Sequence, residues 1–310
     1  MFRNPILYLL IFFAQHSFAQ SNLPAVASGK INRHHLTDTL QDIEKTIDVW
    51  LPKDYTEQNR YAVIYFHDGQ MLFDSTHTWN KQEWEIDETV GELLEAGQLK
   101  PCIVVGIWNA GAARHAEYFP QKPFESLPKA VRDSIIEANR PQGQSVFNDY
   151  AIYSDAYLKF LVNTIKPFID SNYATLPDLN NTLVGGSSMG GLISLYAICE
   201  YPNVFGGAAC ISTHWPGIFT TDNNPIPGAF MQYIQANAPD PSTHKLYFDR
   251  GTETLDAWYG KYQQQADQIF RTKGFNDTNF KSLEFKGADH SEKSWSERMA
   301  IPLLFLLGED

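Results

Sequence analysis

The chain has 310 residues, 43% of them hydrophobic, and a formal net charge of −12 at pH 7. Nucleic acids and anionic membrane surfaces attract basic proteins, so this charge argues against both as partners. The length permits one domain or two, but the sequence contains no internal repeat, no low-complexity segment and no stretch that resembles a linker.

The first nineteen residues have the pattern of a cleaved signal peptide. Arg3 supplies a basic start, residues 6–14 form an apolar run, and Ser17-Phe18-Ala19 gives the small-x-small pattern of a cleavage site. The apolar run is shorter than the roughly 20 residues that span a bilayer, which argues against an uncut anchor. We therefore expect a mature chain that begins at Gln20, is secreted or periplasmic, and makes no stable membrane insertion after cleavage.

The first half of the chain alternates predicted strands and helices. Residues 46–51 alternate in polarity, as a half-buried strand does, and residues 61–66 form a continuous apolar run, as a fully buried strand does. Residues 83–96 have helical spacing, and residues 102–108 form a second buried strand. Buried strands joined by helices are typical of parallel sheets.

The second half continues this order. The predicted helices cover residues 155–169, 189–199, 259–272 and 295–307, and the predicted strands cover residues 182–184, 207–211, 246–249 and 282–285. The alternation predicts an α/β fold: a single domain over residues 20–310 with a mostly parallel central sheet and helices on both faces.

Residues 121–153 interrupt the alternation. They contain Pro123, Pro128 and Pro141 and a short helical piece near residues 129–139. An insertion of this length beside strand ends often forms a lid or a substrate wall. A surface excursion without a role in the site is the alternative, and the sequence favours neither.

The three cysteines are Cys102, Cys199 and Cys210. They lack the close spacing of a zinc site and the density of a disulfide scaffold. We expect buried free thiols, and a single Cys199–Cys210 bridge is the alternative in an oxidising compartment.

The pentapeptide Gly186-Ser187-Ser188-Met189-Gly190 fits the pattern G-x-S-x-G. It lies between a predicted strand and a predicted helix, which is the strand-turn-helix corner that presents a nucleophilic serine. The pattern selects Ser188, because a register one residue earlier would put Met189 where the last glycine belongs. At the start of the helix, the backbone N–H of Met189 is free to donate to an oxyanion.

A serine hydroxyl needs a base to take its proton, and after such a corner the chain order is serine, acid, histidine. His290 follows the last predicted strand and precedes the final helix, which is where the base belongs. His244 precedes a strand, at the wrong end of the sheet. His214 follows a strand and could line a pocket, but it comes before any credible acid.

The acid should follow the strand at residues 246–249. Asp249 belongs to the strand itself, whereas Glu253 and Asp256 lie in the loop beyond Gly251. Either loop carboxylate could orient the imidazole and stabilise its cation. We favour Asp256 narrowly, and the sequence leaves both open.

The loop after the strand at residues 61–66 should supply the second oxyanion donor. Gly69 lets the chain turn so that the N–H of Gln70 faces the pocket. His67 and Asp68, with His115 and His214 elsewhere, invite a metal site, but their spacing matches no recognised zinc pattern, so we expect no metal. We expect His67 and Asp68 to line the pocket.

Together these motifs resemble the putative esterase family, also called the esterase D or feruloyl and enterobactin esterase-like group, of the α/β-hydrolase superfamily. The resemblance extends from about residue 46 to the end of the chain. It is carried by His67-Asp68-Gly69-Gln70, Phe73-Asp74, Glu83-Trp84, residues 103–107 with Asn109, Arg114, Glu117-Tyr118 and Pro120, Gly185–Gly191 and Gly287–His290.

The resemblance implies an α/β-hydrolase fold without a cofactor, with Ser188 as nucleophile and His290 as base. It also implies an oxyanion hole from Gln70 and Met189, and places Asn109 and Arg114 close to the pocket. There these two residues either contact the substrate or form a buried polar network that shapes the loop. Many relatives have a carboxylate three residues after the loop glycine, where this chain has Thr254. That departure keeps the choice between Glu253 and Asp256 open.

The leading hypothesis is a secreted serine esterase that cleaves a carbohydrate-linked acyl or feruloyl ester, or a siderophore ester, through an acyl-enzyme. An acyltransferase or a peptidase could use the same triad. A different class is a hydrolase-like module that binds a glycan or siderophore without catalysis. In that case the aromatic residues near the pocket would hold the ligand, namely Trp79, Trp108, Trp215 and Trp258.

Overall fold

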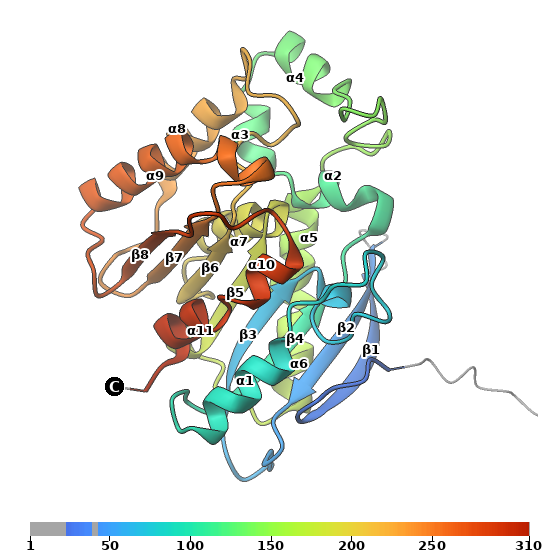
Figure 1. Cartoon of the computed structure of the whole chain (residues 1–310), viewed down its shortest axis with the longest axis vertical. Coiled ribbons are helices and arrows are strands. Elements are labelled where there is room, and N and C mark those ends of the chain that lie inside the picture. Colours follow the sequence, from blue (N-terminus) through green and yellow to red (C-terminus); the bar gives the residue numbers. More distant parts are fainter. Residues whose placement is uncertain (1–22, 39–42, 310) are drawn as a thin grey trace, which may run out of the picture.

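A central sheet of eight strands organises the part of the chain that the structure, a computed structural model, describes: residues 23–38 and 43–309 (Figure 1). The strands are β1 (Lys30–Asp38), β2 (Ile43–Leu51), β3 (Ala62–His67), β4 (Cys102–Ile107), β5 (Thr182–Ser187), β6 (Gly207–Ile211), β7 (Lys245–Arg250) and β8 (Phe280–Glu284). They lie in the order β1-β2-β4-β3-β5-β6-β7-β8. The predicted signal peptide at residues 1–19 and the predicted new N-terminus at Gln20 lie outside the described residues.

The sheet is mostly parallel, which confirms the predicted fold class. The β1–β2 and β2–β4 pairs are antiparallel, and the five other neighbouring pairs are parallel. Every residue of β3, β4, β5 and β6 is buried. Strands buried on both faces need apolar side chains at successive positions, and this explains the continuous apolar runs in the sequence.

Helices cover both faces of the sheet. They are α1 (Ile86–Glu95), α2 (Arg114–Tyr118), α3 (Gln121–Glu125), α4 (Lys129–Ile136), α5 (Ser154–Phe160), α6 (Lys166–Asn172), α7 (Met189–Glu200), α8 (Ile226–Asn237), α9 (Gly260–Thr272), α10 (Glu292–Ser296) and α11 (Ala300–Leu307). Among the described residues, none of these helices combines the length and the apolar character needed to cross a membrane.

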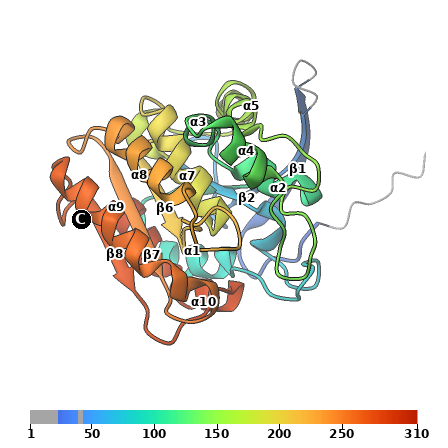
Figure 2. The same cartoon turned by 90° about the horizontal axis from the view of Figure 1, so that it is seen from above.

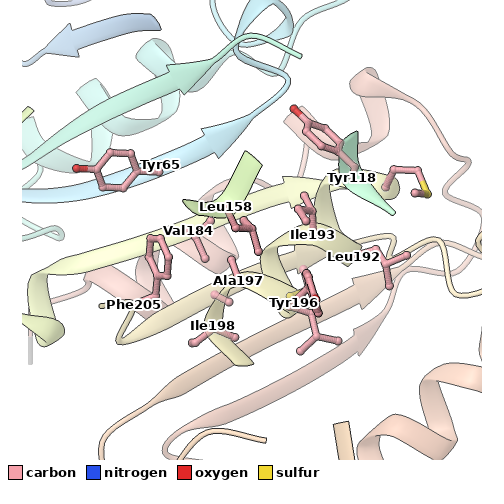
Figure 3. Packing of buried hydrophobic residues seen from close by; sticks show 14 of the residues in the cluster. Tyr65, Tyr118, Leu158, Val184, Leu192, Ile193, Tyr196, Ala197, Ile198 and Phe205 are labelled. Carbon is pink, nitrogen blue, oxygen red and sulfur yellow. The ribbon is translucent and has the colours of Figure 1, made fainter. Parts of the chain in front are cut away.

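The side chains of β3 show the two layers. Val63 and Tyr65 point into a core formed with α5 to α9, whereas Ile64 and Phe66 point into a second core with α1, α10 and α11. Helix α7 lies in the first core, where Ile193 and its neighbours pack on β5 and α5 (Figure 3). The resulting sheet is fixed from both sides, so the loops at its strand ends start from rigid positions.

The structure differs from the predicted elements in several places. The predicted helix at 155–169 is α5, a π-helical turn at Leu161–Ile165, and α6. The predicted last helix is two helices, because Pro302 lacks an N–H and fits only the first turn of a new helix, α11. The half-exposed strand β1, the short helices α2 and α3, and α8, whose opening Pro and Gly weaken the helical pattern, were not predicted.

The insertion at residues 121–153 contains α3, α4 and an irregular return segment. Helix α3 packs against α8, and α4 lies beside α3 at the same end of the molecule (Figures 1 and 2). The return segment carries Arg140, one of the residues that line the cavity described below.

Candidate active site

Ser188 occupies the turn between β5 and α7. Its backbone has φ 58° and ψ −120°, a left-handed conformation that is strained for a residue with a side chain. Its N–H donates to the Ile211 carbonyl at 2.9 Å, and its own carbonyl accepts from the His214 N–H at 3.2 Å, so β6 holds the turn from one side. A Cβ on Gly186 would lie 2.6 Å from the backbone of Gly190, so the close approach of strand and helix requires a glycine there.

Ser188 opens onto a cavity of about 720 Å³. The predicted site residues that line it are Asp68, Gln70, Asn109, Arg114, Ser188, Met189, His214 and His290. They come from the ends of β3, β4, β5 and β6 and from the loop before α10. The predicted nucleophile, base and oxyanion donors therefore share one cavity.

His290 is oriented by Asp256. The His290 Nδ1 lies 2.5 Å from Asp256 Oδ1. Asp256 is completely buried, and its other oxygen accepts from the Ser212 hydroxyl at 2.6 Å and from the Gly251 N–H at 2.5 Å. The Ser212 hydroxyl in turn accepts from Trp295 Nε1 at 3.0 Å. A carboxylate held in this way fixes the orientation of the imidazole and leaves its Nε2 free to accept a proton.

Glu253, the other predicted candidate for the acid, is exposed, and in the described part of the chain it forms no hydrogen bond or ion pair with His290. The chain reverses at Thr254, where φ is 53°, and the short helix Thr254–Trp258 then turns Asp256 inward. The Thr254 hydroxyl also accepts from the His290 N–H at 2.9 Å. The geometry thus pairs His290 with Asp256 and leaves Glu253 in solvent.

Asp249 is the third carboxylate of this segment, and it is buried in a different contact. Arg298 donates to both of its oxygens, from Nη2 at 3.0 Å and from Nε at 3.2 Å, and the Tyr247 hydroxyl donates at 2.9 Å. Burial raises the pKa of Asp249, against the opposing effect of Arg298. Asp249 therefore links β7 to Arg298, between α10 and α11, and it is not one of the residues that line the cavity.

The Ser188 side chain contacts a residue that the sequence did not indicate. Tyr259 hydrogen-bonds His214 Nδ1 through its hydroxyl at 2.6 Å. Burial and Asp256 raise the pKa of Tyr259, and a contact with the Ser188 hydroxyl lowers it. Among the described residues, no hydrogen bond joins Ser188 to His290. In serine hydrolases the bond between nucleophile and base is often long in the free enzyme and shortens when substrate binds. The sequence signal that could have identified Tyr259 is its position directly after the loop that carries Asp256.

Gln70 and Met189, the predicted oxyanion donors, both line this cavity. Met189 is the first residue of α7, whose first N–H groups have no acceptor within the helix. Gln70 lies in a short 3-10 helix, Gly69–Met71, directly after β3. This pair could donate to one oxyanion.

Asp68 and Arg114 form the polar support of the Gln70 loop. Arg114 donates to both oxygens of Asp68, from Nε at 2.6 Å and from Nη2 at 2.7 Å, and Asn109 Nδ2 donates at 2.7 Å. Burial alone would raise the pKa of Asp68, but Arg114 and Asn109 outweigh it and hold this pKa below its usual range. The Asn109 N–H donates to Gln70 Oε1 at 3.1 Å, so the network reaches the predicted oxyanion loop.

Two predicted pocket residues are not in the cavity. His67 is fully buried and bonded through Nδ1 to the Tyr157 hydroxyl at 2.7 Å, because it continues the β3 face that carries Val63 and Tyr65. Burial lowers its pKa to about 3. Trp215 is also fully buried, where it stacks on Phe248 and donates to Gln263. Their assignment to the pocket is therefore wrong.

Of the other tryptophans, Trp79 lines the cavity and is 84% exposed at its edge. Trp108 lies against Arg33 and donates to Asp48 at 2.8 Å, away from the cavity. Trp258 packs on the core. The four residues therefore do not form one aromatic binding surface.

The described residues contain no group of three or more His, Cys, Asp or Glu side chains arranged to hold a metal ion. His115 and His214 lie with ring centroids 6.4 Å apart, and His67 belongs to the core. The cysteines Cys102, Cys199 and Cys210 are all buried free thiols, so the alternative Cys199–Cys210 bridge is not formed.

Comparisons with known proteins give the same fold. The chain is 24% identical to the uncharacterized protein YbbA of Bacillus subtilis (strain 168) over 269 residues, which cover 84% of this chain and 92% of that protein. The feruloyl esterase module from Clostridium thermocellum superposes with a TM-score of 0.61 at 16% identity, covering 91% of this chain and 89% of that one.

The enterobactin esterase of Shigella flexneri superposes with a TM-score of 0.64 at 14% identity, covering 91% of this chain and 60% of that one. At identities this low the superpositions show a shared fold alone, which is the α/β-hydrolase fold. The family model described as "Putative esterase" matches residues 40–306. The chain therefore belongs to this esterase family, and it is an ester hydrolase with the α/β-hydrolase fold.

Proposed function

We propose that the protein is a secreted serine esterase that hydrolyses a carboxylic ester through an acyl-enzyme, with Ser188 as nucleophile, His290 as base and Asp256 as acid. The observation that carries the proposal is the buried Asp256–His290 contact of 2.5 Å beside a serine held at φ 58° in the same cavity. An oriented imidazole next to an exposed hydroxyl at a helix start is the arrangement that serine hydrolysis requires.

The chemistry follows from these positions. His290 Nε2 takes the proton of Ser188 as its oxygen attacks the ester carbonyl, and the N–H groups of Gln70 and Met189 stabilise the oxyanion that forms. His290 then gives the proton to the departing alcohol. Water attacks the acyl-enzyme in the second half of the reaction, with His290 again as base. Asp256 stabilises the imidazolium in both halves.

Removal of the nucleophile tests the reaction. Ser188→Ala should lower the turnover of a chromogenic acetyl ester by roughly 10³-fold or more, because the triad acts as a unit. Ser187→Ala is the matched control from the same motif and should keep most of its turnover. Near-normal turnover by Ser188→Ala would exclude Ser188 as the nucleophile.

For the substrate, we propose an extracellular ester of the carbohydrate-linked, feruloyl or siderophore type. The support is that structural neighbours are named as feruloyl and enterobactin esterases. A panel of acetyl, feruloyl and siderophore esters ranks these classes by kcat/KM. Efficient acyl transfer to an added alcohol or cleavage of a peptide in the same panel would instead favour an acyltransferase or a peptidase, and binding without turnover a non-catalytic module.

Secretion is proposed from the N-terminal pattern, residues 1–19. The mass of the protein recovered from outside the cytoplasm should correspond to a chain that begins at Gln20. Recovery of the full-length chain in the cytoplasm would contradict this part of the proposal.

A further inference from the structure

Part of the cavity lining is built around the ring of Phe219. The guanidinium carbon of Arg140 lies 4.7 Å from the centre of this ring. The imidazole of His214 lies 5.4 Å from it, and that of His115 lies 6.1 Å away. All four side chains line the cavity into which Ser188 opens. We call this group the Phe219 subsite.

Arg140 has no acidic partner there. The carboxylates in the cavity lining are Asp68, which is bound by Arg114, and Glu292, which accepts from Asn80 Nδ2 at 2.7 Å. Among the described residues, no carboxylate lies within ion-pair distance of the Arg140 guanidinium. Burial and then the like charge of Arg114 lower the pKa of Arg140, and no acid opposes them. A partly buried guanidinium without a counter-ion is costly unless a ligand supplies one.

His214 contributes a second unsatisfied group. Its Nδ1 is bonded to the Tyr259 hydroxyl at 2.6 Å, and its Nε2 is buried without a hydrogen-bond partner in the described structure. Burial lowers the pKa of His214 well below its usual value, so the ring is neutral, and burial raises that of Tyr259, so the phenol keeps its proton. With the Tyr259 phenol as donor to Nδ1, the hydrogen of His214 lies on Nε2, where it is shielded from the cavity by the burial of this atom.

His115 does not compete for an acidic ligand. Its Nε2 donates to the Gly217 carbonyl at 2.6 Å, and burial lowers its pKa to about 3. The ring is therefore neutral and forms an edge of the subsite. The Arg140 guanidinium lines the cavity as a charged donor without an acidic partner among the described residues, and it suits an anionic oxygen group.

We propose that the Phe219 subsite binds a negatively charged oxygen group, such as a carboxylate, carried by the ester substrate, with Arg140 as its counter-ion. This inference rests on the proposed esterase function, and it narrows the substrate class to acidic esters. It also gives the insertion at residues 121–153 a role, because Arg140 is the insertion's contribution to the cavity lining.

The test compares three chromogenic esters of similar size: the neutral para-nitrophenyl butyrate, the mono-para-nitrophenyl ester of adipate with its charge on the acyl side, and the butyrate ester of a carboxy-nitrophenol with its charge on the alcohol side. The measured quantity is the ratio of kcat/KM for each charged ester to that for the neutral ester. In the wild type we expect this ratio to exceed one for at least one charged probe, and that probe identifies the side of the ester that faces Arg140.

Arg140→Gln should lower this ratio about tenfold or more, since a hydrogen bond to a charged group is lost. Arg140→Glu should bring the ratio below that of Arg140→Gln, whereas Arg140→Lys should retain part of it. Lys129→Gln is the matched control: it removes the same charge from an exposed position of α4, outside the cavity lining. Its ratio should equal the wild-type ratio.

The outcomes separate the two proposals. Turnover of all three esters with the same ratio in wild type and Arg140→Gln overturns the anionic subsite and leaves the esterase function intact. A wild-type ratio below one for both charged probes does the same. If the wild type hydrolyses none of the esters, the proposed function fails, and the inference fails with it.

Discussion

Two groups of residues at the cavity differ in how completely their polar atoms are satisfied. Around Asp256 the polar contacts are complete: Asp256 accepts from His290, Ser212 and Gly251, and Trp295 donates to Ser212. Around Phe219, Arg140 lacks a counter-ion among the described residues. A satisfied network holds a neighbouring side chain in one geometry, whereas a charged donor without a counter-ion beside a cavity is available to a ligand. We therefore propose catalysis for the first group and recognition for the second.

Activity should be more sensitive to mutation of the Asp256 network than to mutation of the Phe219 subsite. Asp256→Asn keeps the size of the side chain but replaces the negative charge, so His290 loses the stabilisation of its imidazolium and the correct tautomer. We expect kcat to fall by about 10³- to 10⁴-fold. Steady-state kinetics on a neutral chromogenic ester measure the effect.

Glu253→Gln is the control for that substitution, since it neutralises the exposed carboxylate of the same loop. We expect a change of about twofold at most, as for a solvent-exposed charge. If the two variants lost activity equally, the assignment of Asp256 as the acid would be wrong.

The buried histidines should make the folded protein sensitive to acid. His67 has a pKa of about 3 in the folded state because of burial, against an ordinary value of 6.5. The unfolded chain therefore binds more protons below pH 6.5, so stability is full above about pH 7 and falls as the pH is lowered. For one such histidine the loss at pH 5 is about 2 kcal/mol. Urea unfolding between pH 7.5 and pH 5 measures it.

His67→Gln isolates this contribution, because an amide can still bond the Tyr157 hydroxyl but does not titrate. Its unfolding free energy should depend less on pH than that of the wild type, by about 1.4 kcal/mol per pH unit below pH 6.5. Parallel pH dependences for the two proteins would show that His67 is not held neutral by the fold.

Tyr259 links the Phe219 subsite to Ser188, and loss of its hydroxyl should have a smaller effect than loss of the Asp256 charge. Tyr259→Phe deletes the hydroxyl that bonds His214 Nδ1 and contacts Ser188. We expect kcat/KM for the preferred charged ester to fall about five- to tenfold, the cost of one hydrogen bond, with a smaller loss for the neutral ester. Equal losses for both esters would separate Tyr259 from the Phe219 subsite.

The sequence predicted those features that depend on local patterns. Central strands appear as apolar runs because both of their faces are buried, and Ser188 is identified because its corner needs small residues at fixed positions. The alternation of side chains along β3 also carried a usable signal. His67 lies on the same face as Val63 and Tyr65, which indicates a position in the core and not in the pocket.

Features that depend on the path of a loop could not be predicted. The left-handed turn at Thr254 decides which of Glu253 and Asp256 pairs with His290. No local sequence pattern predicts such a turn at a non-glycine residue. Arg140 lines the cavity because the insertion folds back toward it. Trp215 does not line the cavity, because its ring packs on Phe248 in the core. These outcomes are decided by tertiary packing.

We propose Ser188 as the reactive nucleophile of this cavity. Labelling of the intact protein with a fluorophosphonate, followed by digestion and mass mapping, tests it most directly. We expect a single adduct on Ser188, formed more slowly in Asp256→Asn and absent in Ser188→Ala. An adduct on another residue, or none on a protein that hydrolyses esters, would contradict it.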